Sequence, residues 1–180
     1  AQTSSTPPGT LAAMSQPPEV RPITEPEVAV LDAAYPECES RHQLRLRQQL
    51  AGEGTYFVAW SGDEPAGWVF LVNPEHASDR ALGGAQLSDL QVAARYRGAG
   101  LGRALLDASE QAARDAGWNT ICLSVTVSNP DNELARSIYH RRGYRDSGQG
   151  EFHDGYHYHD AAGVRRYHGE QHIYLVKRLN

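Results

Sequence analysis

The stretch Arg97-Gly98-Ala99-Gly100-Leu101-Gly102 follows the apolar run from Leu87 to Val92 and leads directly into a helical pattern. Its three glycines let the backbone approach a ligand with no Cβ in the way, so that several N–H groups can point in one direction. A helix that begins here presents unpaired N–H groups and the positive end of its dipole to an anion. The stretch therefore predicts a strand, a turn and a helix start that together cradle a pyrophosphate group.

Two common phosphate-binding loops do not fit this spacing. A dinucleotide fingerprint, G-x-G-x-x-G, would need glycine where the chain has Arg103. A P-loop ends in Gly-Lys-Ser/Thr, and the single lysine of the chain is Lys177. What remains is R-x-x-G-x-G from Arg97, preceded by L-x-V from Leu90 to Val92. This pattern resembles the acyl-CoA loop of the GNAT superfamily of N-acetyltransferases.

A second motif lies downstream, between Asn132 and Tyr144. Its asparagine, alanine and tyrosine, followed by the pair Gly143-Tyr144, resemble the other signature of the same superfamily. The two motifs stand in the expected order and separation, so the resemblance covers about residues 20–180. It implies an α/β (α+β) fold with a central mixed, mostly antiparallel sheet and helices on both faces. One departure is Ala94, where the family commonly has proline.

The pattern of apolar, glycine and proline residues predicts the elements of this fold. The spacing Thr24-x-x-Glu27 is a capping box that starts a helix near Glu25. A long loop is expected over residues 150–169, which carry four histidines and three tyrosines. Strands are expected near residues 20–23, 55–60, 65–72, 85–92, 120–127, 144–147 and 171–179, and further helices near 42–50, 101–116 and 132–142.

Length and composition fit one domain of a cytoplasmic protein. Residues 1–19, rich in Pro, Ser and Thr, are expected to form a tail, and residues 20–180 a single domain. The net charge of −5 argues against a nucleic-acid partner, and no apolar run approaches a membrane span. Two cysteines are too few for a disulfide framework or a metal site. The sequence leaves open whether the chain forms a homodimer.

The resemblance also implies roles for individual residues. The backbone of the strand before the glycine turn pairs with the pantetheine arm of acetyl-CoA, with the Val92 N–H near the thioester carbonyl. Tyr139 lies beside the sulfur as a catalytic residue, because a phenol stays protonated at neutral pH and can donate to a departing thiolate. Asn132 caps its helix, touches the arm, or does both. The residues expected to bind acetyl-CoA are Leu90, Gln91, Val92, Arg97, Gly98, Gly100, Leu101, Gly102, Arg103, Asn132 and Tyr139.

The general base is less well defined by the sequence. The proton of an ammonium substrate can pass to a carboxylate, to a histidine or to water. Asp89 is chosen as the catalytic base because it lies on the cofactor strand, where members of the family often carry an acid. Its position in the strand alternates with those of Leu90 and Val92, and a solvated or structural aspartate is an equally open interpretation.

The predicted function is transfer of an acetyl group from acetyl-CoA to a primary amine. A small-molecule acceptor is favoured, because the long aromatic loop over residues 150–169 suggests enclosure and its acids Glu151, Asp154 and Asp160 could attract a cationic amine. A protein acetyltransferase acting on a lysine or an N-terminus is one alternative, and a non-catalytic acyl-CoA sensor is another. No metal is expected, because the histidines of the loop lack an acidic or cysteine partner set.

Overall fold

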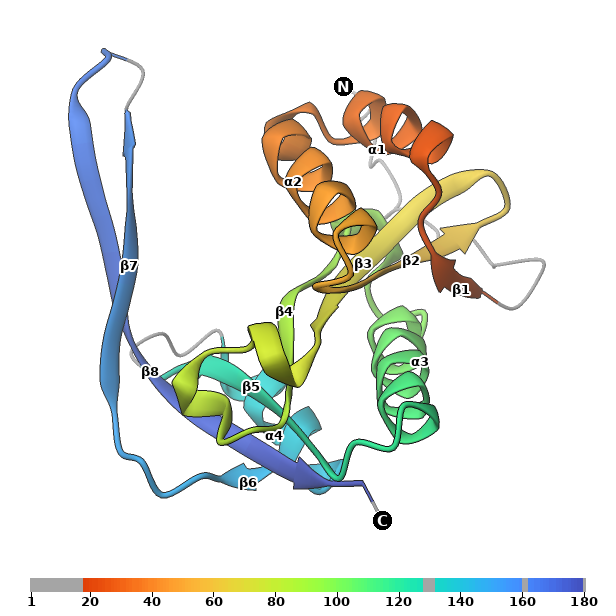
Figure 1. Cartoon of the computed structure of the whole chain (residues 1–180). Helices are drawn as coiled ribbons and strands as arrows, with labels where there is room; N and C mark the ends of the chain where they lie inside the picture. The colour runs from red at the N-terminus through yellow and green to blue at the C-terminus, as the bar shows by residue number, and fades with distance from the viewer. Residues whose placement is uncertain (1–17, 128–131, 160–161, 180) are drawn as a thin grey trace, which may run out of the picture.

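The computed structural model describes residues 18–127, 132–159 and 162–179, and an eight-stranded sheet runs through it (Figure 1). The predicted tail lies almost wholly outside the described residues, although Glu19 already belongs to the first strand. The strand order is β1-β2-β3-β4-β5-β8-β6, and β7 pairs with β8. The strands are β1 (Glu19–Pro22), β2 (Gly54–Ser61), β3 (Glu64–Val72), β4 (Ala85–Val92), β5 (Thr120–Thr126), β6 (Arg145–Asp146), β7 (Phe152–His159) and β8 (Arg165–Arg178).

The sheet is mixed and mostly antiparallel, as predicted. Strands β4 and β5 form the parallel pair, and the other pairings between described strands are antiparallel. Helices cover both faces (Figure 1). On one face, α3 (Leu101–Asp115) packs on β2, β3 and β4, and α4 (Glu133–Arg141) lies on the same side. On the other face, α1 (Val28–Ala34) and α2 (Glu39–Leu50) cover the side chains of β2 and β3.

Helix α3 shows why the sequence forms this arrangement. Its buried residues recur at helical spacing, with Leu101, Leu105 and Leu106 in contact with the sheet. Gly117 ends the helix with a φ of 78°, a conformation that glycine adopts at no steric cost. Between β1 and α1, the Glu27 carboxylate accepts hydrogen bonds from the Thr24 backbone N–H and hydroxyl, at 2.8 and 2.7 Å. The turn that precedes α1 is therefore held by the residues that predicted it.

Strand β4 contains a bulge that the sequence analysis did not anticipate. Its register with β3 shifts in the region of Ser88 to Gln91, and Asp89 has a φ of 56°. Hydrogen-bonded pairing with β5 reaches only from Ala85 to Leu87. A bulge adds a residue to one strand and bends it. The two parallel strands therefore diverge beyond Leu87, in the middle of the sheet.

The prediction of a long loop over residues 150–169 is wrong. Strands β7 and β8 pair from Phe152 opposite His172 to His159 opposite Arg165, and they form a ribbon that projects from the body of the protein (Figure 1). We call the paired segments Phe152–His159 and Arg165–His172 the arm. Its alternating aromatic and polar residues favour strands. Two of its glycines leave room for the Tyr167 side chain, because an added Cβ would lie 2.6 Å from the Tyr167 hydroxyl at Gly155 and 2.5 Å from the Tyr167 ring at Gly169.

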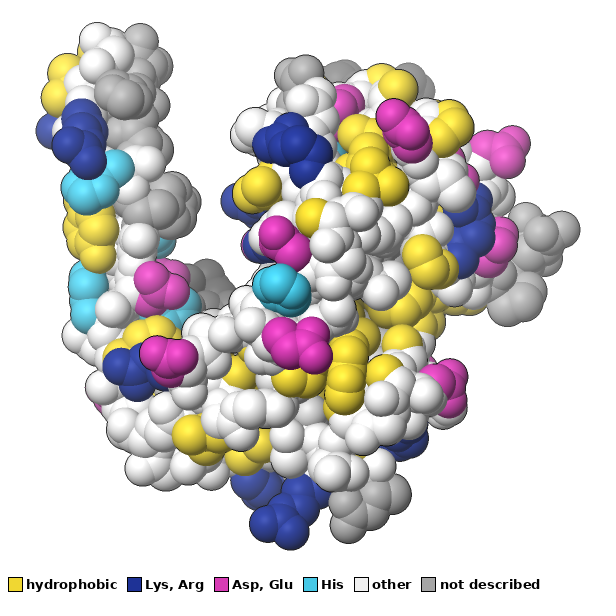
Figure 2. Space-filling model, viewed as in Figure 1, with side chains coloured by type: hydrophobic (Ala, Val, Ile, Leu, Met, Phe, Trp, Pro, Cys, Tyr) yellow, Lys and Arg dark blue, Asp and Glu magenta, His cyan; other side chains and the backbone are white. Residues whose placement is uncertain are grey.

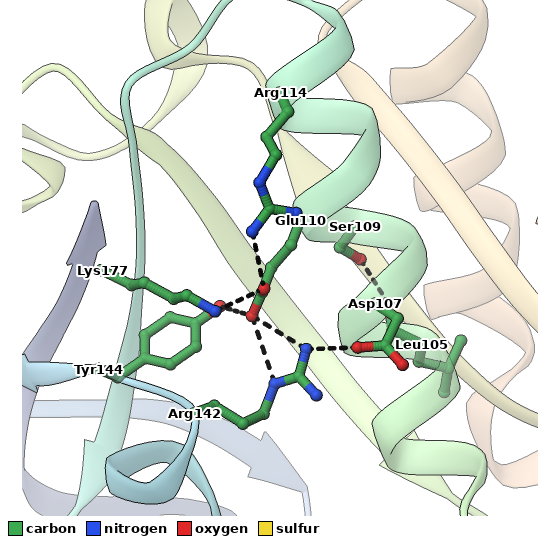
Figure 3. A network of polar contacts seen from close by, with 8 residues as sticks. All are labelled: Leu105, Asp107, Ser109, Glu110, Arg114, Arg142, Tyr144 and Lys177. Atoms are coloured by element: carbon green, nitrogen blue, oxygen red, sulfur yellow. Dashed lines mark hydrogen bonds and ion pairs between the residues drawn. The ribbon is translucent and has the colours of Figure 1, made fainter. Parts of the chain in front are cut away.

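A polar network centred on Glu110 ties α3 to the last strand and to the end of α4 (Figure 3). Glu110 is only 3% exposed, and its carboxylate lies 2.6 Å from Lys177 Nζ and 3.1 Å from the Arg142 guanidinium. The Tyr144 hydroxyl donates to the same carboxylate at 3.2 Å, and burial raises the pKa of Tyr144. Arg142 also pairs with Asp107 at 2.6 Å. One buried carboxylate thus neutralises cations from two separate segments.

We predict that Glu110→Gln lowers the free energy of unfolding by about 3–5 kcal/mol, because removing one partner of a buried ion pair leaves the others uncompensated. Urea denaturation measures this loss. The matched control is Arg114→Gln, since Arg114 lies 3.5 Å from the Glu110 carboxylate and its side chain is 36% exposed. That control should cost less than about 1 kcal/mol. Equal losses in the two variants would contradict a central role for Glu110.

Candidate active site

The glycine turn and the helix after it border a cavity of about 600 Å³ on the α3 and α4 face of the sheet. This volume is typical of a small-molecule site. We call it the cofactor cavity. Apolar side chains of β4, α3 and α4 line it, and four arginines line it as well. The lining residues are Leu90, Val92, Tyr96, Arg97, Gly98, Gly100, Leu101, Gly102, Arg103, Leu106, Ala135, Ile138, Tyr139, Arg141 and Arg142.

The backbone of the glycine turn is shaped to receive an anion. Gly98 and Gly100 have φ values of 82° and 83°, and a Cβ on either would meet open space. The first helical hydrogen bond of α3 runs from the Ala104 N–H to the Gly100 carbonyl. The N–H groups of Leu101, Gly102 and Arg103 therefore have no acceptor within the helix. They line the cavity at the positive end of the helix dipole.

The divergence of β4 from β5 leaves one backbone edge of β4 without a neighbouring strand beyond Leu87. Leu90 and Val92 lie on this free segment, and their side chains face the cofactor cavity. Gln91 points away and is exposed. Such an edge can pair with an extended ligand as it would with a strand.

Four arginines line the cofactor cavity. Arg97 Nε donates to the Val92 carbonyl at 3.2 Å, and Arg142 is held by Glu110 and Asp107. Arg141 contacts the Ser137 hydroxyl at 3.0 Å. Within the described part of the chain, Arg103 has no hydrogen-bond or ion-pair partner. Arg97 and Arg103 were expected from the sequence, whereas Arg141 and Arg142 were not, because they join the site only through the placement of α4.

Tyr139 lies where the cofactor cavity meets a second cavity on the opposite side of the sheet, because it lines both. Its ring packs edge-on against Tyr144, with ring centroids 5.9 Å apart. Desolvation raises the pKa of Tyr139 to about 12. None of the described residues hydrogen-bonds its hydroxyl. The phenol thus keeps its proton at neutral pH and is free to donate it to a bound molecule.

The second cavity, which we call the acceptor cavity, measures about 360 Å³. It lies between α2, β4 and the root of the arm, by which we mean the end of the arm that joins the sheet, at Phe152 and His172. Asp89 faces it from the bulge in β4. Arg45 of α2 lies 2.6 and 2.7 Å from Asp89, and both contacts end on Oδ2. The other carboxylate oxygen, Oδ1, has no such contact within the described residues. The full lining is Arg45, Gln86, Leu87, Ser88, Asp89, Leu90, Leu123, Ser124, Tyr139, Asp154 and Tyr174.

Arg45 is a site residue that the sequence analysis missed. Its guanidinium lies 4.7 Å from the centroid of the Phe70 ring of β3 and donates to Gln48 of its own helix at 2.7 Å. With Asp89 of β4, three elements therefore meet at this side chain. The bulge in β4 that Arg45 supports did have a signal in the sequence. The apolar residues of β4 are Ala85, Leu87, Leu90 and Val92, and the step of three breaks strict alternation. An arginine forty-four residues away gives no such signal.

Asn132 does not join the others at the cofactor cavity. It directly precedes α4, with helical φ and ψ angles of −86° and −1°, and its side chain makes no capping hydrogen bond. It is also absent from the cavity lining that the described residues form. The expectation that Asn132 caps its helix is wrong, and its contact with the cofactor stays a prediction.

The acids of the predicted loop are separated in space. Asp154 reaches the acceptor cavity from β7, Glu151 lines a different cavity near Asp146, and Asp160 lies outside the described residues. Figure 2 shows the arm standing apart from the body across an open hollow, so it does not close over the acceptor as predicted. No group of three His, Cys, Asp or Glu side chains within the described ranges is arranged to hold a metal ion.

Burial raises the pKa of the Cys122 thiol to about 12, as expected for an inert structural cysteine. No described helix has the length and apolar character needed to span a membrane.

Comparisons with known proteins agree with this geometry. Residues 25–144 match the model of the acetyltransferase (GNAT) family. Among solved structures, yncA from Salmonella typhimurium with its cofactor acetyl-CoA aligns with a TM-score of 0.63 and 16% identity, over 91% of this chain and 94% of that one. The ribosomal-protein-S18-alanine N-acetyltransferase from Escherichia coli aligns with a TM-score of 0.61 and 18% identity, over 91% and 94%.

A nourseothricin acetyltransferase has a higher identity of 26%, with a TM-score of 0.50, over 71% of this chain and 66% of that one. No curated protein sequence matches the chain. The family match covers two thirds of the 180 residues and includes both the glycine turn and Tyr139. The chain is an acetyltransferase of the GNAT family.

Proposed function

We propose that the protein transfers the acetyl group of acetyl-CoA to a primary amine of a small cationic molecule. The observation that carries this proposal is the junction of two cavities at Leu90 and Tyr139. One cavity has apolar side chains for the pantetheine arm and arginines for the phosphates. The other has carboxylates for an amine. The two substrates would therefore meet where β4 and β5 diverge.

The described residues fit acetyl-CoA. The N–H groups of Leu101, Gly102 and Arg103 would hold the pyrophosphate, and the free edge of β4 from Leu90 to Val92 would pair with the arm. Arg103 and Arg141 are the arginines best placed to meet a further phosphate, because acidic side chains do not neutralise them as they do Arg142. When bound, acetyl-CoA supplies an activated thioester.

Two side chains of the site would move protons. We assign Asp89 Oδ1 to accept a proton from the substrate ammonium, so that the neutral amine can attack the thioester carbonyl. We assign the Tyr139 hydroxyl to donate its proton to the sulfur as the carbon–sulfur bond breaks. The products are then an amide and the free thiol of CoA. The ion pair with Arg45 would hold the Asp89 carboxylate in the acceptor cavity, next to Leu90.

The size and charge of the acceptor cavity support a small amine. Its volume is about 360 Å³, and Asp154 adds a carboxylate that Arg45 does not neutralise. A protein acceptor is the second candidate, and the open hollow between the arm and the body favours it (Figure 2). The neighbours include one enzyme named for each class of acceptor, nourseothricin and a ribosomal-protein alanine.

We expect Tyr139→Phe to lower kcat by roughly 10²-fold or more while the KM for acetyl-CoA changes little, since the hydroxyl acts as charge develops on the sulfur. Thiol release from acetyl-CoA measures this across a panel of small amines and free N-terminal peptides, and the same panel tests the proposed function. Tyr144→Phe is the matched control, because that hydroxyl contacts Glu110 rather than either cavity. Because the pKa of Tyr139 is about 12, its ionisation should not lower kcat below about pH 11.

Wild-type protein that releases no thiol with any amine would overturn the proposed function. Turnover of peptides in preference to small amines would favour the protein-acceptor candidate. An unchanged kcat in Tyr139→Phe would reduce Tyr139 to a packing residue.

We expect Gly102→Ala to weaken acetyl-CoA binding about tenfold, which is about 1.4 kcal/mol, without lowering the melting temperature of the free protein. The added Cβ would lie 3.7 Å from Val92 Cγ2, an ordinary contact, and would project into the cradle. Alanine also favours the helix over glycine by about 0.5–1 kcal/mol. Isothermal titration with acetyl-CoA and thermal unfolding of the free variant measure the two effects. Unchanged affinity would place the pyrophosphate elsewhere.

We expect Asp89→Asn to lower kcat/KM for the amine by roughly 10²-fold or more, since an amide cannot accept the proton. Arg45→Gln separates the catalytic role of Asp89 from its structural role in the bulge, because this variant removes the same ion pair and keeps the Asp89 carboxylate. If Asp89 is the base, Arg45→Gln retains far more activity than Asp89→Asn, although urea denaturation shows similar losses of stability. Equal losses of activity in the two variants would mean that Asp89 serves only to hold the bulge.

A further inference from the structure

A third cavity, of about 450 Å³, lies along the arm and shares Asp154 with the acceptor cavity. It is lined by Asp154, Gly155, His168, Glu170 and His172. Asp154 pairs with Glu170 in the strand register, and Phe152 pairs with His172, so these four side chains lie on one face of the arm. The third cavity therefore extends the acceptor cavity along one face of the arm.

The root of the arm fixes this face toward the acceptor cavity. Phe152 packs against Tyr174, with ring centroids 5.3 Å apart, and Arg80 lies 4.2 Å above the Phe152 ring. Tyr174 lines the acceptor cavity itself. On the opposite face of the arm, the Tyr167 ring packs between the rings of His153 and His157, with centroids 5.8 and 5.0 Å away. The arm thus has one face filled by its own rings and another that carries a cavity.

Asp154 and Glu170 stand directly opposite each other, and like charges in that position destabilise a pair of strands. Among the described residues, Asp154 Oδ1 accepts a hydrogen bond from the N–H of Gly155 alone, at 2.8 Å. Glu170 Oε2 accepts the Thr126 hydroxyl at 3.2 Å and lies 3.7 Å from His168 Nε2. In the described part of the chain, neither carboxylate has a lysine or arginine within salt-bridge distance. A cation between them would remove their repulsion.

We propose that this third cavity binds a second cationic group of the acceptor, so that the acceptor is an extended molecule with at least two amines. The proposal rests on the proposed function for the reacting amine, which would lie beside Asp89 and Tyr139. The second amine would lie between Asp154 and Glu170. Tyr174 and Glu170 are four residues apart on β8, which corresponds to about 13 Å along a strand. Because Tyr174 lines the acceptor cavity, an acceptor that reaches from that residue to Glu170 would need a separation of about this length between its two amines.

The experiment compares straight-chain terminal diamines of four to ten carbons with monoamines of the same length. We expect the kcat/KM ratio of diamine to monoamine to rise with chain length and to be greatest for the longest diamines. Asp154→Asn and Glu170→Gln should each lower that ratio roughly fivefold, the effect of one partly exposed ion pair. Glu151→Gln is the matched control, because Glu151 belongs to the same segment but lines a different cavity. It should leave the ratio unchanged.

A binding measurement separates this inference from the proposed function. Isothermal titration of the ten-carbon diamine into protein saturated with coenzyme A involves no acetyl transfer. Weaker binding in Asp154→Asn and Glu170→Gln, but not in Glu151→Gln, supports the second site even if no amine is acetylated. If small amines are acetylated but diamines are no better than monoamines and the variants bind them equally, the second site is refuted while the proposed function stands.

Discussion

The parallel pairing of β4 with β5 ends at Leu87 and Leu123, and both main cavities depend on that limit. Further pairing would join the strands into a continuous sheet and close the space between them. The bulge at Asp89 bends β4 just beyond the last pair and turns Leu90 and Val92 toward α3 and α4. The same bulge directs Asp89 to the opposite face. One extra residue thus distributes the side chains of a single strand between two sites.

The bulge has an energetic cost that its neighbours offset. A residue other than glycine with a φ of 56° is uncommon, although aspartate tolerates this region better than most. The ion pair with Arg45 involves side chains only 17% and 22% exposed, where solvent screens charges less than at the surface. Arg45 also packs over Phe70 of β3. Helix α2 and strand β3 therefore stabilise the distortion from the side on which the proposed acceptor binds.

The family resemblance and local patterns in the sequence together predicted most of the fold, and the local patterns predicted the glycine turn and helix start that border the cofactor cavity. The glycine turn, the helical stripe that starts at Leu101 and the strand before it are contiguous, so their geometry follows from neighbouring residues. The acceptor side could not be predicted in this way. Arg45 reaches Asp89 only after α2 has packed on the sheet, and Arg142 reaches Glu110 only through the placement of α4. The arm was predicted as a loop because strand pairing between Phe152–His159 and Arg165–His172 forms a ribbon outside the body of the protein, where the side chains that the structure describes form no buried apolar face to mark the strands in the sequence.

The placement of the two cavities on opposite faces has a kinetic consequence for the proposed reaction. The cofactor cavity is bordered by α3 and α4, and the acceptor cavity by α2 and the arm. Each ligand would approach from its own side of the sheet, and neither would lie across the path of the other. A ternary complex could therefore assemble in either order, and each product could leave without waiting for the other. Double-reciprocal plots would intersect, as in a random sequential mechanism, rather than run parallel as in an exchange through an acetylated enzyme.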